Sequence, residues 1–573
     1  MGLRYKAPEW IFEDINYDHY IVQYDGDIVK EVTKYPNSYV TIINEKYAIL
    51  TVGKNVEINL ENLQFETIVY VKPAEMFTLQ EITPVEASQA SFLQLNLPLN
   101  LTGKGVNVAI IDTGIDYLSE EFIDEKGETR IELIWDQSIL SNKEDNNKVV
   151  PFGIVYSKNQ IQDAINAHRQ GKDPYEIVPS KDIIGHGTNM SGIIGGRGVN
   201  PELKGVAPDC DFIVIRLLED YSFKAQFGIS IPIFNITVIF AALEFLNKYL
   251  IIDYKPTIIY FPLGSNLGTH KGVGILDQFI ESVCMRSGVA FVTGAGNQRV
   301  SGEHTSGTIL GVGESSLFEL DVSPDQKDIW IEIWVEAPNI ASLTILSPSG
   351  ESTGVINPII NTFEVYEFIV EKSSIKINYF FPEESAGDQL MRVRFYNLQK
   401  GIWTFILTGN SILDGKYNAW IPQAGITIGQ TTLMPADPYG TVTNPGNGRF
   451  VITAAGYNQN NNNIINYSGM AFKDNYVNVI DVAAGAVNAI TVAPSNTIAV
   501  VNGTSVSAAV VAGASALLFQ WGIIDKNDPL MYSQTLKTYI ARGTVKRSGD
   551  VYPNPQWGYG ILNILTLFQN ITS

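Results

Sequence analysis

Three residues that together can activate a hydroxyl nucleophile lie in three separate glycine-bearing motifs. Asp112 belongs to Ile-Asp-Thr-Gly, His186 to Gly-His-Gly-Thr and Ser505 to Asn-Gly-Thr-Ser. A serine hydroxyl is a poor nucleophile near neutral pH, but a neutral imidazole can take its proton and later deliver it to a leaving group. A carboxylate on the other ring nitrogen fixes the tautomer and stabilises the imidazolium. Asp, His, Ser is one of three chain orders known for such a triad, so we predict nucleophilic serine catalysis.

The segments around these residues predict the elements that position them. The apolar run from Val106 to Ile110 alternates and ends at Asp112, which indicates a buried strand. Open α/β sheets place ligands at the carboxyl ends of such strands. Small apolar residues follow Ser505, from Ala508 to Phe519, and predict a buried helix whose positive N-terminal end favours a developing oxyanion. The two glycines that flank His186 allow the chain to approach it closely.

These motifs resemble those of the subtilisin family. A fourth motif, Thr-Gly-Ala-Gly-Asn at 293–297, lies between His186 and Ser505, where that family keeps an oxyanion-stabilising Asn. The resemblance implies a serine endopeptidase with an α/β catalytic domain built on a parallel sheet. It gives the catalytic roles to Asp112, His186 and Ser505. The Asn297 amide would then bind the oxyanion with the Ser505 backbone N–H.

The resemblance also places a cleft for a protein or peptide substrate. Subtilisins bind extended peptides by adding a strand to exposed backbone edges. Leu263 and Gly264 fall where the family has its edge strand, and Ala295 and Gly296 would form the opposite wall. Asp182, four residues before His186, is expected to bias the adjacent subsite.

Residues 1–80 look like a small separate α+β unit. Four strand-like runs occur at 20–24, 39–43, 47–52 and 67–71, with a hairpin turn at 44–46. The unit resembles the inhibitory prodomain of subtilisins, whose C-terminal tail lies in the substrate cleft. The family's usual interval before Asp112 places self-cleavage at Gln80–Glu81. The protein's own prodomain is thus an expected partner.

A second unit interrupts the catalytic domain, which we assign to residues 81–314 and 439–573. Residues 315–438 read as short alternating strands separated by turns, and we predict an all-β jelly roll. Strand-like runs begin at Leu317, Ile329, Met391 and Gly401. At the end of the chain, a short helix is expected from Ile561 to Phe568.

Composition restricts the partners and the compartment. The 573-residue chain has a formal net charge of −21, which argues against a nucleic-acid partner. Cys210 and Cys284 are expected to be buried free thiols. No metal-ligand spacing is evident, and we expect no metal and no cofactor. The apolar stretch from Ile229 to Leu246 contains Pro, Asn and Glu, so we predict a core helix with its approach and no membrane span.

Several features narrow the resemblance to the clostridial Csp-type germination proteases. They are the lack of a secretion signal at the N-terminus, the prodomain, the insertion and the stretches 134–138 and 151–156. Such proteases reside in dormant spores and cleave the precursor of a cortex-degrading lysin. We therefore expect a monomer that is made in the cytoplasm and packaged in the spore. Asn189 and Ala509 depart from the family pattern but remove no catalytic group.

Two other functions remain open. Some members of this group have lost triad residues, so the chain could act by binding alone, as a pseudoprotease or sensor. The intact triad and Asn297 count against this alternative. The insertion could instead recognise carbohydrate or a cell-wall partner, with Trp330, Trp334 and Trp403 as stacking surface. Packing in a core is the favoured explanation of the same residues.

Overall fold

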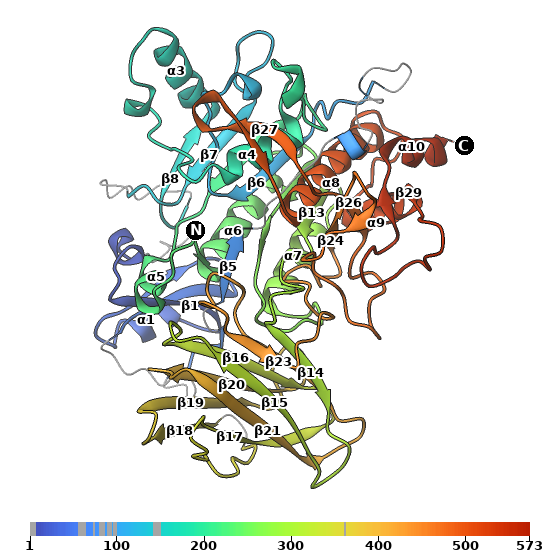
Figure 1. Ribbon diagram of the computed structural model, residues 1–573. Coiled ribbons are helices and arrows are strands. Elements are labelled where there is room, and N and C mark those ends of the chain that lie inside the picture. The colour runs from blue at the N-terminus through green and yellow to red at the C-terminus, as the bar shows by residue number, and fades with distance from the viewer. Residues whose placement is uncertain are drawn as a thin grey trace.

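A parallel sheet of buried strands forms the centre of the molecule (Figure 1). The computed structural model describes residues 7–54, 65–72, 75–79, 86–88, 94, 100–140, 150–359 and 362–572. The parallel strands follow the order β7 (Ile131–Asp136), β9 (Asp211–Arg216), β6 (Asn107–Asp112), β11 (Thr257–Tyr260), β13 (Val289–Gly294), β24 (Val451–Asn458) and β26 (Val482–Gly485). At the edges lie β8 (Ile154–Ser157), β25 (Asn463–Ile464), β29 (Thr544–Val545) and β30 (Ile561–Leu562).

Helices cover both faces of this sheet, which explains why its strands are apolar throughout. Val108 and Ile110 of β6 pack in the cluster that holds α4 (His186–Gly195) and α8 (Thr504–Phe519). Ala109 and Ile111 pack in the opposite cluster, with α6 (Ile236–Ile252) and α7 (Ile275–Cys284). The predicted strand before Asp112 and the predicted helix after Ser505 are confirmed. Further elements are α3 (Lys158–Arg169), α5 (Tyr221–Phe227), α9 (Ser533–Arg542) and the hairpin of β27 (Ala489–Ala493) and β28 (Thr497–Val501).

Helix α8 with the turn η7 (Gln520–Ile524) is long and apolar enough to cross a membrane, but 83% of its apolar window is buried inside the protein. It is thus explained as a core helix. The predicted C-terminal helix begins later than expected: α10 spans Ile564–Thr572, because Ile561 and Leu562 belong to β30.

The N-terminal segment forms a four-stranded antiparallel sheet in the order β2–β3–β1–β4. Its strands are β1 (Tyr17–Tyr24), β2 (Ser38–Ile42), β3 (Tyr47–Gly53) and β4 (Ile68–Lys72), which matches the predicted runs. One face packs with α1 (Ile28–Val32) around its own core of Val22, Val40 and Leu50. The other face lies on α6, where the rings of Tyr47 and Phe240 are 5.3 Å apart.

The insertion is a sandwich of two antiparallel sheets, at the bottom of Figure 1. One sheet has the order β14 (His304–Thr308), β22 (Lys416–Trp420), β16 (Ile329–Val335), β20 (Gln389–Tyr396), β19 (Ser373–Phe380) and β18 (Thr362–Phe368). The other has β17 (Ile340–Leu346), β21 (Gly401–Ser411), β15 (Ser315–Val322) and β23 (Thr432–Met434). The sandwich begins at His304, eleven residues before the predicted boundary. Strand β14 escaped prediction because it is a polar edge strand, His-Thr-Ser-Gly-Thr.

The tryptophans of the insertion are buried. Trp403 is 0% exposed and packs between the two sheets. Trp330 and Trp334, on the outer face of β16, are 7% and 6% exposed and pack against Ile233 and Leu267 of the catalytic domain in one apolar cluster. Burial therefore favours a packing role for these three side chains.

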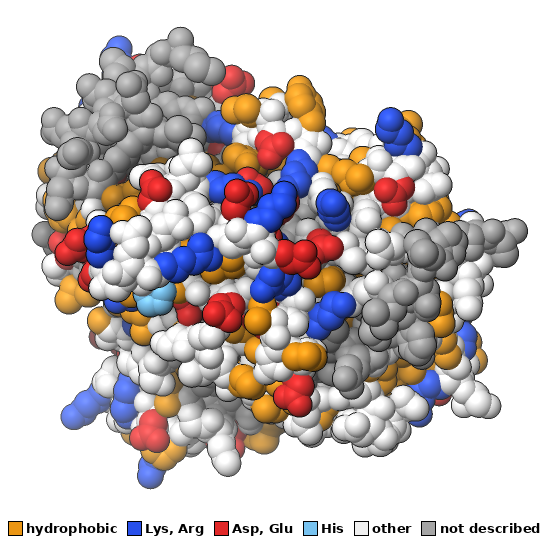
Figure 2. Space-filling view, turned by 90° about the horizontal axis from the view of Figure 1, so that it is seen from above, with side chains coloured by type: hydrophobic (Ala, Val, Ile, Leu, Met, Phe, Trp, Pro, Cys, Tyr) orange, Lys and Arg blue, Asp and Glu red, His pale blue; other side chains and the backbone are white. Residues whose placement is uncertain are grey.

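The two cysteine thiols lie in the interior, whereas acidic and basic side chains lie on the surface (Figure 2). Cys210 and Cys284 are buried free thiols, as predicted, and burial raises the pKa of Cys210 to about 12. On the face shown in Figure 2, acidic and basic side chains lie side by side, and neither sign forms a continuous field among the residues drawn in colour.

Candidate active site

His186 and Asp112 meet as a buried pair. Asp112 ends β6 and His186 begins α4. His186 Nδ1 lies 2.8 Å from Asp112 Oδ2 and 2.9 Å from Oδ1. The Thr113 N–H also donates to Asp112 Oδ1, at 2.6 Å. Because an ionised carboxylate can only accept, Nδ1 must carry the proton in this contact. Nε2 of the neutral ring is then the nitrogen that can accept a proton.

Glycines allow the tight approach around His186, as the sequence predicted. Gly185 has φ +87°, a left-handed conformation that suits glycine. A Cβ on Gly187 would lie 2.1 Å from the carbonyl oxygen of Gly114, so no side chain fits there. Both positions bring the start of α4 against the loop that follows Asp112.

Asp182 holds the His186 loop instead of lining the cleft as expected. Its Oδ1 accepts from Thr113 Oγ1 and the Gly185 N–H, each at 2.8 Å. Its Oδ2 accepts from the N–H and the hydroxyl of Thr188, at 2.8 and 2.7 Å. The residue is 4% exposed. Both carboxylate oxygens are therefore committed to positioning the loop that carries His186.

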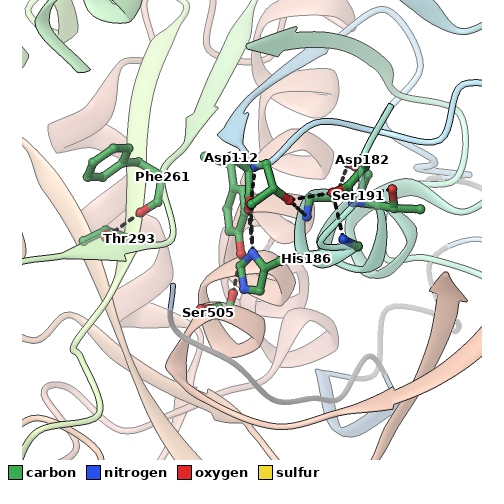
Figure 3. Close-up of polar contacts among 12 residues, drawn as sticks. Asp112, Asp182, His186, Ser191, Phe261, Thr293 and Ser505 are labelled. Atoms are coloured by element: carbon green, nitrogen blue, oxygen red, sulfur yellow. Dashed lines mark hydrogen bonds and ion pairs between the residues drawn. The ribbon is translucent and has the colours of Figure 1, made fainter. Parts of the chain in front are cut away.

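Ser505 lies in the first turn of α8, at the end of the sheet where β6 delivers Asp112 (Figure 3). Figure 3 shows its side chain beside the His186 ring, on the side away from Asp112. The hydroxyl is buried and makes no hydrogen bond to the described residues. The Ser505 backbone is fixed by Tyr260 at the end of β11, whose hydroxyl donates to the Ser505 carbonyl oxygen at 2.7 Å.

The side-chain amide of Asn297 has a defined orientation. Its Oδ1 accepts from the N–H of Thr504 at 3.2 Å and from the Thr504 hydroxyl at 3.3 Å. A backbone N–H can only donate, so this contact identifies the oxygen of the amide. Asn297 is thereby tied to the residue directly before Ser505, with its Nδ2 donors on the other branch of the amide.

The end of the N-terminal segment occupies the predicted cleft. Strand β5 (Met76–Leu79) lies between β10 (Phe234–Asn235) and β12 (Leu263–Gly264), antiparallel to both. Leu79 pairs with Leu263, and Thr78 pairs with Gly264. The tail therefore takes the place of an added peptide strand. The predicted cleavage residues Gln80 and Glu81 follow β5 and lie outside the described residues.

Comparison with known proteins agrees with this geometry. A model of the subtilase family matches residues 103–317 and 408–560, which is more than half of the chain. The chain belongs to the subtilase family. It is accordingly a serine endopeptidase, and the unmatched residues 318–407 fall within the sandwich insertion of this subtilase.

A solved structure is similar over most of the subtilase. The CspB protease of Clostridium perfringens matches with a TM-score of 0.74 and 27% sequence identity, covering 86% of this chain and 98% of that chain. No curated protein sequence matches the chain.

The two residues predicted for the opposite wall are part of the subtilase framework. The backbone of Ala295 bonds to Ala454 and Thr443, at 2.8 and 3.2 Å. The Gly296 N–H donates to Thr504 Oγ1 at 3.1 Å. Ala295 is 0% exposed and packs in an apolar cluster behind the wall. Both residues are buried parts of the wall, whereas Leu263 and Gly264 offer a strand edge.

Buried charges of the tail and the insertion meet around the backbone of Gly268 in the catalytic domain, and we call this group the charge junction. Lys72 Nζ lies 2.7 Å from Glu75 Oε2 in the tail. In the insertion, Glu332 Oε1 accepts from Arg392 Nε at 2.9 Å, and its Oε2 accepts from the catalytic-domain Gly268 N–H, also at 2.9 Å. A Cβ on Gly268 would lie 3.3 Å from Lys72 Nζ and 3.4 Å from Glu75 Oε1, so the two pairs are neighbours.

The charges compensate one another in this dry environment. Burial raises the pKa of Glu332, but the positive charges of Arg392 and Lys72 outweigh burial and hold it below its ordinary value. Burial dominates at Glu75, whose pKa is raised despite Lys72. Sequence reasoning missed this group and also Tyr260, because none of these residues belongs to a local motif.

Two further histidines, His270 and His304, have structural roles. His270 and His304 stack on opposite sides of Trp420, with ring centroids 4.1 and 4.6 Å away. Burial lowers the pKa of His270 to about 4. Among the residues that the structure describes, no group of three or more His, Cys, Asp or Glu is placed to hold a metal ion.

Proposed function

We propose that this subtilase is made as a zymogen that cuts its own chain at Gln80–Glu81 and keeps the severed segment in its cleft. The position of β5 carries the proposal. The strand is bound on both edges in the manner of an added peptide, and its last residue, Leu79, directly precedes Gln80. The similarity to the CspB protease of Clostridium perfringens supports protease activity.

In this proposal Ser505 is the nucleophile and His186 the general base. The Ser505 side chain turns so that its hydroxyl donates to His186 Nε2, and its oxygen attacks the carbonyl carbon of Gln80. His186 takes the proton and returns it to the leaving amine of Glu81. Asp112, already bonded to Nδ1, stabilises the imidazolium formed in between.

Asn297 is the proposed oxyanion donor. The contacts of its Oδ1 with Thr504 leave Nδ2 to donate to the oxygen of the tetrahedral intermediate. The Ser505 N–H, at the N-terminal end of α8, supplies a second donor in the region of positive helix dipole. Neither donor needs to reorganise during the reaction if the amide keeps this orientation.

Mass spectrometry of purified protein tests self-processing. Wild type should yield a fragment whose N-terminus is Glu81, and Ser505→Ala should remain intact. A fluorophosphonate probe should label Ser505 once the tail is displaced. Wild type that stays intact under folding conditions, with Ser505 unlabelled, would instead support a catalytically silent protein that acts by binding.

We further propose that the physiological substrate is the precursor of a spore cortex-lytic enzyme. The proposal rests on the Csp-type sequence resemblance and on the similarity to the CspB protease. In this role the protein is made in the cytoplasm, is packaged in the spore as a monomer and acts during germination; the insertion is a jelly roll. Incubation of the purified precursor with wild type should release its propeptide, and Ser505→Ala should leave it uncut.

A further inference from the structure

The edge strand that binds the tail is unusually short, and a side chain of the insertion takes over where it ends. Strand β12 pairs with the tail only at Leu263 and Gly264. The next residue, Ser265, turns away and bonds to Asn444 through both its N–H and its carbonyl oxygen. The tail residues Phe77 and Met76 therefore have no β12 partner on this edge.

Gln423 fills the gap. It lies in the loop between β22 and β23, which belongs to the insertion, and it is 1% exposed. Its Nε2 donates to the carbonyl oxygens of Met76, at 2.8 Å, and Gly264, at 2.9 Å. Its Oε1 accepts from the Asn266 N–H at 3.3 Å. The amide thus continues the ladder between the tail and β12 by means of a side chain.

The same loop is fastened to both walls of the cleft. The Ala424 N–H donates to Gln298 Oε1 at 3.4 Å, beyond Asn297 on the wall opposite β12. The Ile421 N–H donates to the Glu303 carbonyl oxygen at 3.0 Å, and its own carbonyl accepts from Asn266 Nδ2 at 3.3 Å. Gln423 is therefore held in place by the catalytic domain and not only by the tail.

Successive side chains of the tail enter two different environments. Phe77 is 0% exposed and packs with the catalytic domain, 5.7 Å from the ring of Phe261. Met76, on the opposite face of the strand, is 1% exposed. It belongs to an apolar cluster that combines Ile229, Ile233 and Leu267 of the catalytic domain with Trp330, Trp334, Leu390, Trp420 and Ile426 of the insertion.

We infer that the insertion builds a substrate subsite for an apolar side chain, with Gln423 as the donor to that residue's carbonyl group. The inference rests on the proposed function, in which a substrate strand replaces the tail. The subsite selects a polypeptide with a flexible apolar residue directly before the large apolar residue that fills the Phe77 position. In the tail these two residues precede Gln80 by four and three positions. Such a subsite requires insertion residues, and a plain catalytic domain would lack it.

Two fluorogenic peptides test the inference on the self-processed full-length chain. The severed tail is first displaced from the cleft. One peptide copies residues 76–80 with an acetylated N-terminus, and the other copies residues 77–80 with a free N-terminus, so that it has no carbonyl group at the Met76 position; each is followed by the same leaving group. Burial of the Met side chain and one extra hydrogen bond should give the longer peptide about a tenfold larger kcat/KM in wild type. In Gln423→Ala this advantage should fall about fivefold, because the hydrogen bond is lost while the Met side chain is still buried, and cleavage of the shorter peptide should change less. Gln399→Ala, on the exposed part of the insertion, is the matched control and should behave as wild type.

Equal cleavage of both peptides by wild type would overturn the inference. So would a Gln423→Ala variant that loses activity on both peptides alike, because that result indicates a framework role. If wild type does not cut its own chain at Gln80–Glu81 and its Ser505 stays unlabelled after the tail is displaced, the proposed function itself fails, and the subsite with it.

A second measurement does not require the tail to leave the cleft. The rate of self-processing during folding should fall at least tenfold in Met76→Asp, because a carboxylate would enter an apolar cluster, and should be retained in Met76→Leu. An Asp at this position that is processed as fast as wild type would contradict an apolar subsite, whether or not free peptides are cut.

Discussion

The triad and the charge junction are both buried, yet they are held in different ways. Asp112, His186 and Ser505 come from one folding unit: Asp112 is held by the Thr113 N–H and by His186, and the Tyr260 hydroxyl holds the Ser505 backbone. The charge junction gathers charged side chains of the tail and the insertion around the catalytic-domain residue Gly268. A triad residue can thus change without disturbing its neighbours, whereas each charge of the junction depends on the others. Changes in the triad should alter rate, and changes in the junction should alter stability.

The largest expected effect is on the triad side of this comparison. Asp112→Asn should lower the rate of self-processing about 10⁴-fold, because an amide at this position favours the wrong tautomer of His186. The unfolding free energy should stay close to that of wild type. The rate of appearance of the Glu81 N-terminus and urea denaturation measure the two quantities. A comparable loss of both would show that the triad is not independent of the fold.

A change in the charge junction should lower the unfolding free energy and leave the rate of self-processing nearly unchanged. Glu332→Ala leaves Arg392 and the Gly268 N–H without their acceptor in a dry site, which should cost about 3–5 kcal/mol of unfolding free energy. Protein that remains folded should still process itself at a rate within a few-fold of wild type. Glu364→Ala, an exposed glutamate of the same sandwich, is the control and should change neither quantity. A stability loss no larger than that of the control would remove the distinction.

Asn297 has both a structural and a proposed catalytic role, because its Oδ1 accepts from Thr504 and its Nδ2 is the proposed donor to the oxyanion. Asn297→Ala should reduce the rate about 10²–10³-fold, the loss associated with one oxyanion donor in subtilisin. Asn297→Asp keeps an acceptor for Thr504 but loses the Nδ2 donor, so it should be equally slow and better folded than the Ala variant. Near wild-type activity of the Asp variant would show that the amide does not donate to the oxyanion.

The smallest effect concerns pH. Burial raises the pKa of Glu303 from 4.5 to about 8, and its Oε2 accepts from Ser301 and Asn266. A protonated carboxyl is thus favoured in the folded state, so its stability contribution is complete below pH 4.5 and is lost as the pH rises towards 8. Between pH 5 and pH 7, wild type should lose about 2 kcal/mol relative to Glu303→Gln. Parallel stability profiles of the two proteins would mean that Glu303 is ionised in the fold.

The sequence predicted an element correctly where residues close by in the chain require a particular residue type at a position. The glycines around His186, the alternation before Asp112 and the small residues after Ser505 each report a local constraint, and the corresponding elements lie where they were predicted. Those three segments then meet because parallel strands end at one edge of the sheet. The four N-terminal strands were predictable for the same reason, because each is a run of β-branched, aromatic and other apolar residues beside turn residues.

The rest depends on contacts between segments far apart in the chain. Gln423 lies 347 residues from Met76, and nothing in its neighbourhood marks it as a ligand of the tail. The charges of the junction look like ordinary strand surface until the insertion packs on the catalytic domain. Asp182 was assigned to the cleft because spacing alone cannot distinguish a residue that holds a loop from one that faces a substrate.

The most direct test of the account is the N-terminal sequence of the purified protein, compared between wild type and Ser505→Ala. Wild type should contain a second polypeptide that begins at Glu81, with residues 1–80 still associated, and the variant should be a single intact chain of equal stability. The same cut in both proteins would assign it to another protease and contradict a nucleophile at Ser505.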